Sequence, residues 1–269
     1  MKKTKPIPSK FKLYEHTVQS PNWQVDYLPQ FHRWLTGRTP RRFREDFCGS
    51  GKISCEWVRR SPQNRACGLD IDDEALDYAR EVNRAALTPS QQKRTSFIRQ
   101  NVLKPTKEKH DWIGAFNFSF FVFHERREML RYFREAYRSL AKKGTIFLEL
   151  AGGPGFKEPN AETHTTTVPG IGRVTQIWEQ HPYDPITQVG DFSIHFKLPG
   201  GVVLNDAFTY HWRMWQIRDL REVLADAGFQ KTVVLWEKDG EYLPVEELEE
   251  AENPHSWVAY VIGVKSAVK

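Results

Sequence analysis

Residues 45–51 read Glu-Asp-Phe-Cys-Gly-Ser-Gly, EDFCGSG. Residues 43–47 are predicted to be a strand, and residues 53–60 are predicted to be a helix. Gly49 and Gly51 allow the backbone to pass close to a ligand, and a helix that starts there presents free N–H groups to it. The segment therefore predicts a strand–turn–helix unit that binds the polar part of a cofactor.

Short apolar runs and amphipathic runs alternate along the chain that follows this unit. Further strands are expected at residues 65–71, 96–102, 112–118, 145–150, 231–237 and 257–264, and helices at 73–86, 126–140 and 217–227. This alternation predicts an α/β fold in which helices cover both faces of a parallel sheet.

The stretch 152–215 breaks the alternation, because its β-rich runs at 174–179, 189–198 and 202–215 have no helix between them. We therefore expect three parts. They are an N-terminal tail and helical cap at 1–40, a core at 41–151 and 216–269, and an inserted antiparallel β cap at 152–215.

Composition excludes several classes of protein. With 39% apolar and 27% charged residues, the chain of 269 residues has the composition of a folded domain. No run approaches the roughly 18 apolar residues of a membrane span, so no membrane partner is expected. Three cysteines, Cys48, Cys55 and Cys67, have no metal-ligand spacing, and no metal is expected. Their odd number and the lack of a recognisable export signal favour a cytoplasmic location.

Asp70 ends the second predicted strand, in GLDID, nineteen residues after Gly51. A carboxylate at this point can accept hydrogen bonds from both ribose hydroxyls of a nucleoside. The simpler alternative is an ordinary tight turn followed by a surface aspartate. Strand, glycine turn, helix, strand and terminal acid in this order favour the nucleoside.

The residues around the turn distinguish two kinds of nucleoside cofactor. Glu45 and Asp46 precede the turn, and their charge opposes the anionic pyrophosphate of a dinucleotide. Phe47 and Ser54 also replace the first and third glycines of the dinucleotide motif G-x-G-x-x-G. The cationic sulfonium and ammonium groups of S-adenosylmethionine suit nearby carboxylates, so the residues favour this cofactor.

These residues resemble the class I S-adenosylmethionine-dependent methyltransferases, from about residue 43 to the C-terminus without the insertion. The resemblance implies a Rossmann-like, seven-stranded, mostly parallel methyltransferase sheet, here with an antiparallel β insertion and an N-terminal helical cap. It also implies S-adenosyl-L-methionine as cofactor. The strings REDFCGSG, AFNFSFFVF and TYHWRMW look like a bacterial group of methyltransferases to which we assign no substrate.

The resemblance also implies roles for particular residues. Asp70 would bind the ribose, Ile71 would flank the adenine, and Asn101 takes the place of an aspartate that contacts the adenine amino group. The backbone of Asn117 and Phe118 would face the methionine part. The predicted cofactor-binding set is Arg44, Glu45, Phe47, Gly49, Gly51, Asp70, Ile71, Asn101, Val102, Asn117 and Phe118.

No catalytic triad is expected, because in-line methyl transfer needs alignment and exclusion of water more than a base. Three residues are candidates near the acceptor. His124 is either a base or the start of a helix. Arg213 binds an acidic group of the substrate or stacks on Trp212 or Trp215. Tyr14 is either a residue of a lid or an ordinary packing aromatic.

The leading hypothesis is a methyltransferase for a small molecule. The alternative is an RNA or DNA amino methyltransferase, favoured by the F-x-G-x-G variant at Phe47 and the net charge of +5. A second alternative is a non-catalytic protein that binds S-adenosylmethionine, and a dehydrogenase comes last. The sequence does not predict the oligomeric state.

Overall fold

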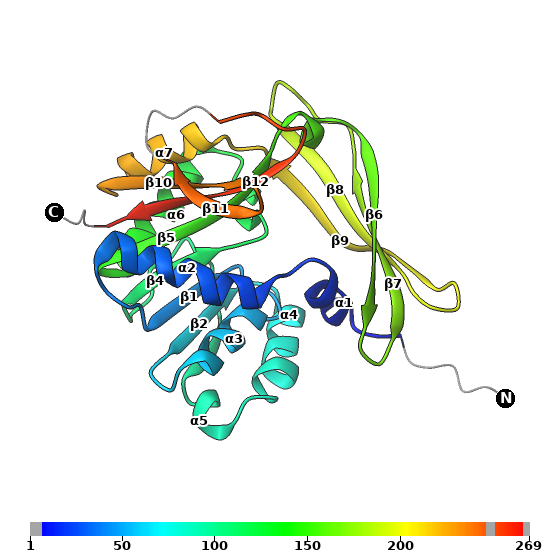
Figure 1. Ribbon diagram of the computed structural model, residues 1–269, viewed down its shortest axis with the longest axis horizontal. Coiled ribbons are helices and arrows are strands. Elements are labelled where there is room, and N and C mark those ends of the chain that lie inside the picture. The colour runs from blue at the N-terminus through cyan, green and yellow to red at the C-terminus, as the bar shows by residue number, and fades with distance from the viewer. Residues whose placement is uncertain (1–6, 246–250, 266–269) are drawn as a thin grey trace. The chain divides into compact units, whose positions relative to one another are not determined.

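The computed structural model describes residues 7–245 and 251–265 and divides into two compact units. Figure 1 traces the chain through both. One unit comprises Pro21–Phe156 and Arg213–Lys269, and the other comprises Met1–Ser20 and Lys157–Trp212.

Eight strands form the main sheet of the first unit among the described residues, in the order β11-β10-β12-β5-β4-β1-β2-β3. Neighbours from β5 to β3 run parallel, whereas β12, β10 and β11 add antiparallel pairs. The strands are β1 (Arg42–Asp46), β2 (Arg65–Asp70), β3 (Thr95–Arg99), β4 (His110–Ala115), β5 (Leu140–Gly152), β10 (Lys231–Lys238), β11 (Glu241–Val245) and β12 (Trp257–Val264).

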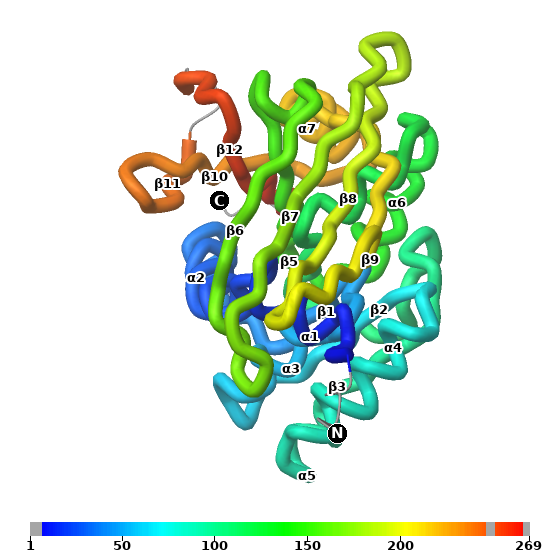
Figure 2. Tube along the Cα trace, turned by 90° about the vertical axis from the view of Figure 1, so that its right-hand side faces the viewer, coloured from blue at the N-terminus to red at the C-terminus, as the bar shows by residue number. Residues whose placement is uncertain are grey.

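Helices lie against both faces of this sheet (Figures 1 and 2). On one face α2 packs beside α3, and on the other α6 packs beside α7. The helical segments are α2 (Pro21–Thr36), α3 (Lys52–Arg60), α4 (Asp73–Tyr78), its π-helical continuation η1 (Ala79–Arg84), α5 (Pro89–Gln92), η2 (Ser119–Val122), α6 (Arg126–Ser139), η3 (Pro154–Lys157) and α7 (Ile217–Asp226).

Aromatic side chains fill the core between β1, β4 and α3. Phe43 stacks on Trp112 with ring centroids 4.0 Å apart, and Trp57 meets Trp112 edge to face at 5.2 Å. Trp112 and Phe147 are fully buried. Burying such large rings supplies much of the apolar area that holds the helix to the sheet.

The strand order places a crevice at one edge of the sheet. From β1 the chain proceeds outward through β2 and β3, then returns to β4 on the other side of β1. In open α/β sheets a ligand binds beyond the carboxyl ends of the strands at such a reversal. A ligand is therefore expected beside the segments that follow β1, β2 and β4.

The second unit is an antiparallel sheet with one helix. Its strands, in the order β6-β7-β8-β9, are β6 (Asn160–Val168), β7 (Gly172–Gln180), β8 (Val189–Lys197) and β9 (Val203–Arg213). Figure 2 shows them side by side. The helix α1 (Lys10–Thr17) contributes Leu13 to a core with Val174, Ile194 and Phe196.

The predicted fold class is confirmed, with differences at the edges. The main sheet has β11 in addition to the seven expected strands, and the inserted sheet has β6 in addition to the three expected runs. Almost all of β6 is exposed, so it lacks the apolar alternation that identifies a strand. The helix predicted over 73–86 becomes α4 followed by the π-helical η1.

The N-terminal boundary also differs from the expected one. The expected cap at 1–40 is divided, because α1 joins the inserted sheet whereas α2 packs on α3 and β5 of the main unit. The first six residues of the expected tail lie outside the described residues. Within the described part of the chain, no helix is both long enough and apolar enough to cross a membrane.

Candidate cofactor pocket

A tight turn after β1 leads into α3. Phe47, Gly49 and Gly51 have positive φ angles of 55°, 50° and 66°. A Cβ atom at position 51 would lie 2.1 Å from the ring of Phe97, so the turn packs against β3 only because this residue is glycine. The backbone thereby comes close to the end of β2, as the sequence predicts.

The carboxylate of Asp70 ties this turn to the end of β2. Its Oδ2 accepts from the backbone N–H of Gly49 at 2.7 Å, and its Oδ1 accepts from Ile71 at 2.7 Å and Asp72 at 3.1 Å. Hydrogen bonds to an ionised acceptor are among the stronger ones in proteins. Asp70 is therefore held in one orientation before any ligand arrives.

A pocket lies between this carboxylate and the segments after β3 and β4. It is lined by Phe47, Asp70, Ile71, Gln100, Asn101, Val102, Val122 and Phe123. Five of these residues, at positions 47, 70, 71, 101 and 102, belong to the set predicted to bind the cofactor. Gln100, Val122 and Phe123 were not predicted; for the last two, the apolar run 112–123 gives no sign of which side chains turn toward a pocket.

The pocket combines one acid with mostly apolar walls. Phe47, Ile71, Val102, Val122 and Phe123 supply the apolar surface, and Asp70 supplies the carboxylate. A planar heterocycle attached to a sugar has this division of polarity. The residues therefore fit the adenosine part of S-adenosylmethionine.

Glu45 lies beneath the turn and is almost fully buried. Its Oε2 accepts from the backbone N–H of Ser54 at 2.8 Å, in the first turn of α3. Burial raises the pKa of Glu45 to about 8, and the charges of Asp70 and Asp46 add to this effect. The carboxyl group of Glu45 therefore gains or loses its proton close to neutral pH, and a nearby cation favours the ionised form.

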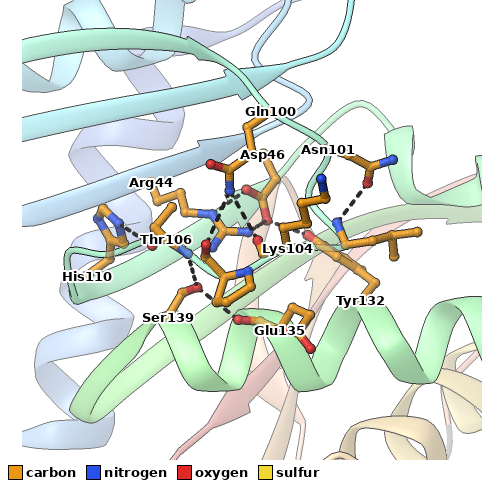
Figure 3. Close-up of polar contacts among 12 residues, drawn as sticks. Arg44, Asp46, Gln100, Asn101, Lys104, Thr106, His110, Tyr132, Glu135 and Ser139 are labelled. Carbon is orange, nitrogen blue, oxygen red and sulfur yellow. Dashed lines mark hydrogen bonds and ion pairs between the residues drawn. The ribbon is translucent and has the colours of Figure 1, made fainter.

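Asn101 belongs to the loop that follows β3 (Figure 3). Its Oδ1 accepts from the backbone N–H of Leu103 at 2.8 Å, and the adjacent Gln100 donates from Nε2 to the carbonyl of Lys104 at 3.2 Å. These bonds fold the loop back on itself. Asn101 is held at the wall of the pocket while its amide NH2 group is left for other contacts.

The structure does not bring Arg44 into the pocket with the rest of the predicted set. Its side chain has no exposed surface, and it donates to Asp46 from Nε at 2.6 Å and from Nη2 at 3.0 Å. Tyr132 of α6 donates to the same carboxylate at 2.9 Å (Figure 3). Arg44 therefore supports the end of β1 from within the protein and makes no contact with a ligand through its side chain.

The segment after β4 adopts an unusual backbone conformation. Asn117 and Phe118 have φ angles of 51° and 59°, which is uncommon for residues other than glycine. Glu149 of β5 holds this turn, since its Oε2 accepts from the N–H of Asn117 at 2.6 Å while its Oε1 accepts from Tyr260 at 2.6 Å. Burial raises the pKa of Glu149. Asn117 and Phe118 do not line the pocket, although they follow the strand next to it.

Arg213 and His124, two of the catalytic candidates, meet beside the pocket. Arg213 donates from Nη1 to the carbonyl oxygen of His124 at 2.7 Å, and its guanidinium lies 4.0 Å from the ring of Trp215. Trp215 in turn donates to the carbonyl of Phe123 at 2.8 Å. This arrangement agrees with the stacking alternative for Arg213, which holds the backbone of the pocket wall in place.

Tyr14, the third candidate, belongs to the unit that contains the inserted sheet. Its ring packs on Phe208 with centroids 4.8 Å apart, and its hydroxyl is hydrogen-bonded to Tyr210. Burial is the main cause that raises the pKa of Tyr210 well above its ordinary value. Within its own unit Tyr14 therefore packs as an ordinary aromatic residue, which is one of the two roles that the sequence allows.

No group of three or more His, Cys, Asp or Glu side chains in the described ranges is arranged to hold a metal ion.

Residues 47–144 match the sequence model of a family described as a methyltransferase domain. The match begins at the turn after β1 and ends in β5, so it includes every residue that lines the pocket. No curated protein matches the sequence.

Solved structures share the fold along nearly the whole chain. The S-adenosylmethionine-bound amino pentose methyltransferase CalS10 from Micromonospora echinaspora is 13% identical, with a TM-score of 0.68 and coverage of 98% of this chain and 99% of that chain. The sugar N-methyltransferase KedS8 from a Streptoalloteichus species is 16% identical, with a TM-score of 0.68 and coverage of 97% and 95%. The CcbJ methyltransferase from Streptomyces caelestis is 16% identical, with a TM-score of 0.64 and coverage of 97% and 100%.

The match and the shared fold confirm the resemblance that EDFCGSG and Asp70 indicate. Residues 47–144 match a methyltransferase domain, and the chain as a whole shares the fold of solved S-adenosylmethionine-dependent methyltransferases.

Proposed function

We propose that the protein transfers a methyl group from S-adenosylmethionine to a small-molecule acceptor. The observation that carries the proposal is the pocket in which Asp70 stands beside the apolar side chains of Ile71, Val102 and Phe123. Asp70 would accept from the ribose hydroxyls, and the apolar walls would cover the adenine. Glu45 and the backbone after Phe47 lie on the side where the cationic part of the cofactor would extend.

The cofactor supplies a methyl group on a cationic sulfur, and the protein supplies position and dryness. Asp70 is already oriented by three backbone N–H groups, so little reorganisation is needed when the ribose binds. Glu149 fixes the turn at Asn117, which follows the strand next to the pocket, and fixed surroundings would shorten the search for in-line geometry. No side chain has to take a proton if the acceptor is already a neutral amine.

An amino sugar or a similar small amine is the acceptor that we propose. Two proteins of the same fold are a sugar N-methyltransferase and an amino pentose methyltransferase, and this likeness is the basis for the choice.

The test of the cofactor site is calorimetric titration with S-adenosylhomocysteine. Asp70→Asn keeps the shape of the side chain and removes its charge, so we expect affinity to fall by about 1–3 kcal/mol, or roughly 5- to 150-fold. Asp77→Asn is the matched control, because Asp77 is 64% exposed and pairs only with Arg80 on the same helical segment. Unchanged affinity in Asp70→Asn, or tighter binding of NADH than of S-adenosylhomocysteine to the parent protein, would overturn the proposal.

The acceptor is tested with labelled S-adenosylmethionine and a panel of amino sugars. We expect label to move to the amine of at least one of them and not to the matching sugar that carries a hydroxyl in its place. Transfer to RNA but to no small amine would favour the nucleic-acid alternative.

A further inference from the structure

A second cavity, of about 220 Å³, lies at the edge of the main sheet opposite to the cofactor pocket. It is bounded by Arg42, Arg65 and Thr95, the first residues of β1, β2 and β3, and by His110, the first residue of β4. The cofactor pocket instead follows the carboxyl ends of these strands. The two sites therefore share the sheet but no residue.

The floor of this cavity is the sheet itself, because the connection between β3 and β4 forms no helix. Residues 100–109 join the two strands as a loop. Cys67 and Ser96 are register partners on β2 and β3, and both line the cavity. Side chains that are in register on neighbouring strands point to the same face, so this part of the face is open where the chain could have placed a helix.

Positive charge dominates the lining. Arg42, Arg65, Lys93 and Arg94 face a single carboxylate within the cavity, that of Glu108. A second carboxylate, Asp111, pairs with Arg42 at 2.6 Å from outside the cavity.

Most of this charge is not neutralised by an acid. The guanidinium of Arg94 donates to backbone carbonyls, among them those of Ser61 at 3.0 Å and Val58 at 3.4 Å. Arg65 and Lys93 are exposed and make no side-chain hydrogen bond or ion pair with any residue that the structure describes. Two exposed cations thus line the cavity beside a third that hydrogen bonds hold in place.

The imidazole of His110 lines the cavity and adds no charge to it. The pKa of His110 is lowered to about 3, first by burial and then by the charges of Arg44 and Arg42. His110 is therefore neutral at physiological pH, so the excess of positive charge in the cavity comes from its lysine and arginine side chains.

We propose that this cavity binds a small molecule that carries a phosphate or diphosphate group. Guanidinium groups present several N–H donors in a plane that matches phosphate oxygens, and a lysine adds a mobile point charge. The volume equals that of about seven water molecules at about 30 Å³ each. Such a space accepts a phosphate group with a short organic part or a diphosphate. The proposal does not depend on the proposed methyl transfer, because the two sites are separate.

The test is calorimetric titration with inorganic pyrophosphate and, separately, with ribose 5-phosphate, at constant ionic strength and without divalent cations. We expect saturable binding of at least one of them to the parent protein. The variant Arg65→Glu/Lys93→Glu should bind that ligand at least tenfold more weakly. Tighter binding of ribose 5-phosphate would assign the site to a phosphate ester, and tighter binding of pyrophosphate would assign it to a diphosphate.

Arg134→Glu/Lys142→Glu is the matched control. It changes the net charge by the same amount at two exposed residues that do not line the cavity, so it should retain binding. Affinity for S-adenosylhomocysteine should be unchanged in both variants, which also shows that they fold. Absence of saturable binding of both ligands by the parent protein would overturn the proposal, and so would equal loss in the two variants.

Discussion

Arg44 and Asp46 form a buried ion pair. Its contribution to the free energy of unfolding can be measured against that of an exposed pair with the same contact distances. Both side chains are fully buried, and the two N–H···O contacts measure 2.6 and 3.0 Å. Arg44→Met leaves the carboxylate of Asp46 in the interior with one remaining donor, the hydroxyl of Tyr132. Removing one member of a buried pair typically costs about 3–5 kcal/mol. We therefore expect the free energy of unfolding to fall by that amount.

The chain offers a matched control on its surface. Arg60 holds Asp26 with the same two contacts, 2.6 Å from Nε and 3.0 Å from Nη2, but the side chains are 33% and 47% exposed. Because water screens this pair, Arg60→Met should cost less than about 1 kcal/mol. Arg60 also donates to Asn22 at 2.8 Å and lies 3.6 Å from Glu56, so the two pairs match in their contacts with aspartate and differ mainly in burial.

The assay is urea unfolding followed by tryptophan fluorescence at pH 7. The triple variant Arg44→Met/Asp46→Leu/Tyr132→Phe removes every polar member of the cluster, so it should recover most of the lost stability. Its affinity for S-adenosylhomocysteine should stay close to that of the parent protein if Arg44 only supports the strand. A loss in Arg44→Met no larger than in Arg60→Met would refute the reasoning.

Two further predictions concern pH. His32 and His110 are buried and neutral, with pKa values lowered to about 4 and about 3, mainly by burial. The unfolded chain takes up protons on these residues below about pH 6.5, whereas the folded chain does not. The free energy of unfolding should therefore fall from pH 6.5 to pH 4 by up to about 1.4 kcal/mol per pH unit for each histidine. The urea midpoints of His32→Gln should depend less steeply on pH, and an unchanged slope would contradict this. Burial raises the pKa of Glu45 to about 8, and a cationic cofactor favours its ionised form. Affinity for S-adenosylmethionine should therefore rise from pH 6 to pH 8 and level off, whereas in Glu45→Gln calorimetry should find little change over this range.

The sequence predicts the cofactor pocket well because its signals are local. Gly49, Gly51 and Asp70 stand at spacings set by one strand, one turn and one helix, and the structure closes them into a hydrogen-bonded turn. Ile71 and Val102 could also be predicted, because they come shortly after the ends of β2 and β3. Short-range spacing of this kind does not require knowledge of the tertiary fold.

Other features depend on tertiary packing, which one sequence does not display. Arg44 is a charged residue beside the motif, and only its pairing with Asp46 on the same strand and the position of Tyr132 on α6 reveal that it is buried. Val122 and Phe123 face the pocket because the short helical turn η2 redirects an apolar run that was predicted to be a strand in part. The edge strands β6 and β11 are mostly exposed, so they lack the buried apolar residues by which a strand is recognised in a sequence.

The partnership between α1 and the inserted sheet has a consequence for biosynthesis. Leu13 leaves the ribosome early, yet the residues that bury it, from Val168 to Leu198, are made more than 150 positions later. Until then α1 is a single short helix without its apolar partners, and helices of 8 residues are marginal in water. This part of the chain must therefore complete its native contacts late in translation, after the strands from β1 to β5 have already been synthesised.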